Sequence, residues 1–184
     1  MSFISGIPTL IGSAHTASNS ASVDITSGID STYDEYAFVY TDCGPATVDA
    51  HFGFQVNASG QSGYNETITS SSVHGYEAEP SGSLDVAYDG AFDQVQGTAM
   101  QILGAGIDNA AKYSAAGILV LFGPSSTTYV KHFIARTHFY EDDNNRSMFL
   151  SISGYINVTA AITDIQFKMS TGNFDGVIQM YGIA

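Results

Sequence analysis

The side chains best suited to chemistry are five histidines, a single cysteine and a large excess of carboxylates. The histidines are His15, His51, His74, His132 and His138. No two of them have the spacing of a structural zinc site. His132 and His138 are separated by an even number of residues on one predicted strand, so we expect them to share a face. The sequence therefore predicts hydrogen-bonded or solvent-facing imidazoles and no metal site.

Two short acidic groups could hold a cation. Glu141-Asp142-Asp143 resembles part of a calcium loop, but it lacks the central glycine and the closing glutamate of an EF-hand. Asp30, Asp34 and Glu35 form the second group. We interpret both as solvated turns, with a weak cation site as the alternative.

No catalytic constellation is visible in the chain. Cys43 has no base nearby in the sequence, so we interpret it as a small buried thiol. Two carboxylates about 5 to 9 Å apart would suit a glycosidase. However, with 18 acidic residues such a pair is expected by chance, and no segment singles one out. A Gly-x-Ser-x-Gly elbow and a phosphate-binding glycine loop are both missing. We predict no catalytic residue, no cofactor and no enzyme activity.

The aromatic residues suggest binding more than catalysis. The chain has 11 Tyr and 11 Phe, and many of the Phe fall at positions that predict a core. Five tyrosines fall among Ser, Gly, Asn and Asp, a composition typical of binding loops. These candidate binding residues are Tyr33, Tyr64, Tyr76, Tyr88 and Tyr113. The alternative is that the same rings are half-buried at the edges of a sandwich.

The charge balance restricts the partners. With 18 Asp and Glu against 5 Lys and Arg, the net charge is -13. Nucleic-acid binding requires cations that displace counterions from phosphates, so we expect no contact with DNA or RNA. Anionic membranes should repel the chain, and no apolar run approaches the roughly 20 residues of a membrane helix. The N-terminus has no secretory signal, so we expect synthesis in a cytoplasm.

The elements that must position these residues are strands. Short runs with alternating apolar residues are separated by turn residues, and no run has helical periodicity. The spacing predicts one domain over 1–184, an all-β, jelly-roll-like antiparallel sandwich of about nine or ten strands. We expect strands over residues 21–25, 36–40, 50–56, 66–77, 99–103, 118–122, 129–140, 148–156, 162–169 and 177–181.

Two segments depart from this pattern. Pro8 and Gly12 predict an irregular N-terminal arm over 1–14, which is our candidate for a partner contact. Residues 84–112 are the least decided part. Within them Phe92–Val95 could form a helical turn, and Gly104–Gly106 is expected to end a strand.

Three segments resemble small proteins encoded by tailed bacteriophages of aquatic bacteria, often beside virion structural genes. They are Ser20–Tyr36, Gly123–Phe133 and Phe174–Ile183. The resemblance covers nearly the whole chain and is weakest over 78–116. It implies a virion surface component, either a capsid decoration (cement) protein or a fibre-type module, and it implies no catalytic residues.

The resemblance and the composition together predict a protein that works by assembly on the virion. The expected partners are the major capsid protein and other copies of the chain, in a homo-oligomer such as a trimer. The alternative is a tail-fibre or receptor-binding module whose Tyr-rich and Asn-rich loops recognise a host surface glycan.

Overall fold

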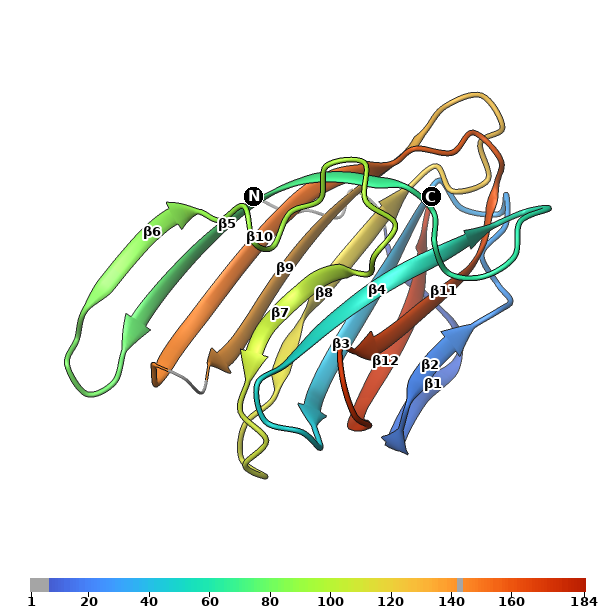
Figure 1. The fold of residues 1–184 in the computed structure, drawn as a ribbon. Helices are drawn as coiled ribbons and strands as arrows, with labels where there is room; N and C mark the ends of the chain where they lie inside the picture. Colours follow the sequence, from blue (N-terminus) through green and yellow to red (C-terminus); the bar gives the residue numbers. More distant parts are fainter. Residues whose placement is uncertain (1–6, 142–143) are drawn as a thin grey trace.

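The computed structural model describes residues 7–141 and 144–184. These residues form twelve strands, and every strand pair is antiparallel (Figure 1). The predicted all-β antiparallel fold is confirmed, although the strands outnumber the nine or ten expected. Across the described ranges, no helix is long and apolar enough to span a membrane.

The strands form two layers of unequal size. The large layer has, in spatial order, β1 (Thr9–Ser20), β12 (Phe174–Ile183), β3 (Glu35–Pro45), β8 (Ala115–Phe122), β9 (Lys131–Glu141), β10 (Arg146–Ile156), β5 (Ile68–Ala78) and β6 (Leu84–Tyr88). The small layer has β7 (Gln101–Ile107), β4 (Ala50–Ala58), β11 (Ile162–Met169) and β2 (Ser22–Ile25). A single residue pair, Ile107 with Glu141, joins the layers at one corner.

The path of the chain between the layers is that of a jelly roll. The order β1-β12-β3-β8 in the large layer faces β2-β11-β4-β7 in the small one. In chain order the strands of this set alternate between the layers, except that β4 and β7 both lie in the small layer, where they pair. Two hairpins extend the large layer beyond this eight-stranded unit. One is β9–β10 and the other is β5–β6, which lies at the far end of the sheet, beyond the small layer (Figure 1).

Two strands account for the difference from the expected number. The first is β1, because the predicted irregular arm is wrong from Thr9 onward: Thr9, Leu10 and Ile11 pair with β12. Gly12 has a φ of +68° and lies where the register shifts between Ile11 and His15, so the glycine forms an irregularity within the strand and does not end it. Residues 1–6 of the predicted arm lie outside the described residues.

The second unexpected strand is β6, within the segment that the sequence left undecided. In the same segment, the prediction that Gly104–Gly106 ends a strand is wrong, because β7 continues through these residues to Ile107. Two register shifts in the β4–β7 pairing accommodate them. Phe92 and Val95 lie in bends, the two residues between them have no regular structure, and none of the four forms a helix.

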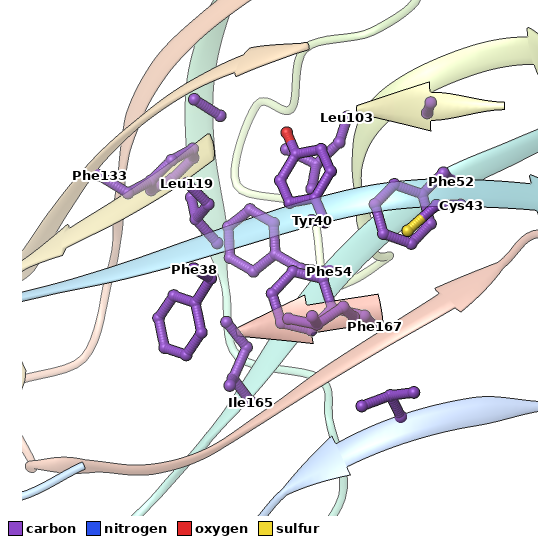
Figure 2. Close-up of a cluster of buried hydrophobic side chains, with 14 of the residues drawn as sticks. Phe38, Tyr40, Cys43, Phe52, Phe54, Leu103, Leu119, Phe133, Ile165 and Phe167 are labelled. Carbon is purple, nitrogen blue, oxygen red and sulfur yellow. The ribbon is translucent and has the colours of Figure 1, made fainter. Parts of the chain in front are cut away.

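Aromatic rings from both layers fill the space between them. Phe38 and Tyr40 point inward from β3 and meet Phe52 and Phe54 of β4 and Phe167 of β11 (Figure 2). Tyr40 and Phe52 have ring centroids 5.3 Å apart, and Phe54 meets Phe133 of β9 edge to face, also at 5.3 Å. Rings in such offset or tilted arrangements add about 0.5 to 1.5 kcal/mol per pair beyond area burial. This core fixes the inner face of the large layer, so alternation along each strand directs the remaining side chains outward.

Candidate interaction surface

A second, separate apolar cluster covers the outward side of the large layer. It comes from β3, β8, β9 and β12, the strands whose other side faces the core. We call it the outer apolar face and define it as Ala37, Val39, Ile118, Val120, Phe122, Ile134, Tyr181 and Ile183. Ala37, Val120 and Ile183 are each only 1% exposed although they point away from the core, because their larger apolar neighbours cover them.

The register of the sheet brings these residues side by side. Ala37 lies opposite both Val120 of β8 and Tyr181 of β12, and Val120 lies in turn opposite Ile134 of β9. Cross-strand neighbours of this kind have Cβ atoms about 5 Å apart, so they form a continuous surface. The signal was present in the sequence, since residues 36–40 and 118–122 are apolar at every position. The pattern predicts central core strands for these runs and does not indicate what covers their second face.

Two shallow hollows lie on this face. The first, about 80 Å³, lies between Ile118, Val120 and Ile134 on one side and Ser151 and Ser153 of β10 on the other. The second, about 120 Å³, is lined by four residues: Pro8, Ala37, Val39 and Tyr181. Both hollows are large enough to receive an apolar side chain from a partner.

The outer apolar face has little of the negative charge that dominates the rest of the chain. Along β3 and β12, the acids lie at the ends: Glu35 at one end, and Asp42 and Asp175 at the other. The outward positions of β9 carry His132, Arg136 and His138, all exposed. A negatively charged partner, including another copy of this chain, therefore meets least repulsion here.

The five candidate tyrosines do not form one site. Tyr33 packs edge to face against Tyr36 with ring centroids 5.9 Å apart, and Arg146 lies 4.0 Å from the Tyr76 ring. Tyr88 is 61% exposed and donates a hydrogen bond to Asp93. Tyr33, Tyr64, Tyr76 and Tyr113 are half-buried.

Tyr113 borders a third hollow, of about 420 Å³. Its ring stacks on Tyr140 with centroids 3.8 Å apart and planes 2° from parallel, and the Lys112 ammonium lies 4.6 Å from the ring centroid. Asp42, Asn109 and Asp175 contribute carboxylate and amide groups to the same hollow. Both stacked rings are half-buried, so part of each remains exposed beside the hollow.

The remaining candidate groups lie in structural positions. The predicted sharing of a face by His132 and His138 is confirmed, and His138 contacts the Ser147 hydroxyl at 2.9 Å. Cys43 is fully buried as interpreted, and desolvation raises the pKa of its thiol to about 12. Within the described part of the chain, no three His, Cys, Asp or Glu side chains are grouped so as to hold a metal ion.

The described members of the two acidic groups lie in bends or at strand ends: Asp30 and Asp34 lie in bends, Glu35 begins β3 and Glu141 ends β9. Asp30 accepts hydrogen bonds from the Thr32 N–H at 2.8 Å and from the Tyr36 hydroxyl at 3.0 Å. Hydrogen bonding by the Thr32 side chain, followed by these two bonds, lowers the pKa of the Asp30 carboxyl. Glu141 lies 3.8 Å from the Arg146 guanidinium. Asp142 and Asp143 lie outside the described residues.

Comparisons with known proteins add no identification. No protein-family model matches the chain, and neither a curated protein nor a solved structure matches it.

Proposed function

We propose that the chain is a structural protein of a phage virion, a capsid decoration (cement) protein that acts by protein–protein assembly. The outer apolar face is the observation that carries the proposal. Isolated surface apolar residues are ordinary, but a contiguous apolar sheet face is typical of an interaction site. The resemblance of three segments to proteins of tailed phages supplies the setting.

The outer apolar face suits contact with further copies of the chain. Its central positions carry no acids, and each copy presents the same surface. Closed homo-oligomers use such self-complementary or ring-forming contacts, and a stable contact buries about 800 Å² per partner. An oligomer held in this way leaves the small layer and the loops free to contact the major capsid protein. It would clamp neighbouring capsid subunits against internal pressure.

Electron microscopy of labelled particles tests the setting. Virions of the phage that encodes the chain are incubated with gold-labelled antibody against the purified protein. We expect regular labelling of the head. Labelling confined to the tail tip would instead support a fibre module, and intact particles without any label would contradict both assignments.

A second candidate function, recognition of a host surface glycan, is favoured by the hollow beside Tyr113. Sugars are bound by aromatic rings together with planar carboxylate and amide groups, and Tyr113, Asp42, Asn109 and Asp175 supply that combination. A glycan array probed with the protein and with Tyr113→Ala tests it. We expect specific signals that the variant loses. Equal signals from Tyr64→Ala and Tyr113→Ala would show that this hollow is not the site.

A further inference from the structure

The free edge of β6 carries an apolar row that the jelly roll does not use. Leu84, Val86 and Tyr88 are 75%, 76% and 61% exposed. Val86 lies opposite Gly75 of β5, and Gly75 lies opposite Phe149 of β10. Phe149 is itself 42% exposed, so the row continues across three strands on the outward side.

The backbone of the same three residues points away from β5. The Ser83 carbonyl accepts from Ala78, and the Asp89 N–H donates to the Ser72 carbonyl, so the odd-numbered residues face β5. By alternation, the N–H and C=O groups of Leu84, Val86 and Tyr88 lie on the edge. Among the described residues β6 pairs with β5 alone. The Val86 N–H donates to the side chain of its neighbour Asp85 at 2.8 Å, where a strand partner would otherwise accept.

Protein edges are usually protected by lysine, proline or a bulge. β6 has none of these, and its single charge is Asp85, which points to the opposite side from Val86. Asp85 makes the edge selective. An added strand places alternate residues beside the apolar row and the intervening ones beside Asp85, so cations at those positions would form favourable cross-strand pairs with the exposed Asp85 carboxylate.

The charge around the β5–β6 hairpin also favours a positively charged partner. Glu77, Glu79, Asp85 and Asp89 lie on or next to the hairpin, and residues 68–97 contain no lysine or arginine. Two copies paired through β6 would bring these acids together, and neither hairpin carries a cation of its own to offset them. Arg146 of the neighbouring strand β10 lies against the Tyr76 ring and 3.8 Å from Glu141. A second copy is therefore disfavoured, and a basic segment is favoured.

We propose that the edge of β6 binds an extended segment of another protein in which apolar residues alternate with Lys or Arg, by adding a strand to the large layer. Backbone hydrogen bonds to Leu84, Val86 and Tyr88 would provide affinity, and the apolar row and Asp85 would provide selection. All strand pairs of the sheet are antiparallel, and we expect the added strand to be antiparallel to β6 as well. This site is distinct from the outer apolar face, and its test does not depend on self-association or on the virion setting.

A synthetic peptide of alternating Val and Lys with capped ends is the probe, and fluorescence anisotropy at physiological salt measures its binding. Val86→Lys introduces the usual edge protection and removes an apolar contact, so we expect affinity to fall roughly tenfold or more. Val95→Lys is the matched control, because Val95 is 80% exposed in the adjoining loop and the change of charge is identical. Circular dichroism verifies that both variants remain folded.

Backbone methylation separates strand addition from plain charge attraction. In an antiparallel pair, the peptide valines opposite Leu84, Val86 and Tyr88 turn their amides toward β6, and the lysines turn theirs away. A peptide N-methylated at valine should not bind, and one N-methylated at lysine should bind as before. Equal binding of the two peptides, or an equal loss with Val95→Lys, would overturn the proposal. So would a dimer of the protein alone that Val86→Lys dissociates, since a second copy would then occupy the edge.

Discussion

At the scale of single residues, the fold contains a lysine in its interior whose ammonium contacts carbonyl oxygens and, among the described residues, no carboxylate. Lys131 is 0% exposed, and its ammonium donates to the carbonyls of Tyr129, Val158 and Thr159 at 2.9, 3.1 and 3.1 Å. Desolvation lowers the pKa of Lys131. The three carbonyls belong to two separate loops, so this one side chain ties together the ends of β9 and β10.

Replacement of Lys131 by methionine should destabilise the protein. Methionine retains the apolar stem but leaves the carbonyls of Tyr129, Val158 and Thr159 without their donor, which we expect to cost about 2 to 4 kcal/mol. Urea denaturation measures the loss. Lys168→Met is the control, since Lys168 is only half-buried on β11, and a change of similar size there would refute the role given to Lys131.

Cys43 predicts a dependence of stability on alkaline pH. Burial raises the pKa of its thiol from 9.0 to about 12, so the folded state holds the proton more tightly than the unfolded chain does. The resulting stabilisation is fully present below pH 9, and it declines by about 1.4 kcal/mol per pH unit as the pH rises toward 12. The difference in unfolding free energy between the natural protein and Cys43→Ala should therefore shrink between neutral pH and pH 11. A constant difference would show that the thiol is not desolvated.

At the scale of elements, β1 makes the N-terminal segment from Thr9 onward part of the sheet. The strand covers the edge of β12, and its Leu10 lies opposite Tyr181 of the outer apolar face. Beyond Ile11, the register shift at Gly12 twists the strand without ending the pairing. The segment is therefore part of the sheet as well as a candidate for partner contact.

Because β1 is part of the sheet, deletion of residues 1–14 should affect folding as well as assembly. Loss of the pairs that Thr9, Leu10 and Ile11 make with β12 exposes an unprotected edge, which promotes aggregation. We expect the melting temperature to fall by several degrees, which corresponds to a loss of about 1 to 2 kcal/mol in the free energy of unfolding. Deletion of residues 1–6 alone should leave the melting temperature unchanged. If both deletions melt like the full chain, β1 does not stabilise the sheet.

The elements show where sequence reasoning succeeds and where it fails. Strands with a period-two pattern or a long apolar run, such as β4, β8 and β11, were located from the sequence because burial selects their residues directly. β1 and β6 were missed, since both lie at sheet edges, where solvent tolerates polar or mixed residues and the pattern weakens. The candidate surface could not be predicted for a related reason. A residue such as Val120 is apolar whether it faces the core or an outer cluster, and only the register distinguishes the two.

At the scale of the whole molecule, the outer apolar face is separated from most of the charge. The net charge of -13 keeps copies apart over most of the surface, and the centre of the outer apolar face lacks acids. This segregation lets a highly charged protein associate at one place and remain soluble elsewhere. The β6 edge, surrounded by acids, is suited to a partner of opposite charge.

The most direct test of the central claim is sedimentation equilibrium of the natural protein, Val39→Lys and Val95→Lys over a wide concentration range. Val39 lies within the outer apolar face, and Val95 lies outside it in an exposed loop; both changes reduce the net negative charge equally. We predict an oligomer for the natural protein and for Val95→Lys, and a monomer for Val39→Lys. A natural protein that stays monomeric at the highest concentration, or a Val39→Lys variant that assembles as well as the others, would contradict the account.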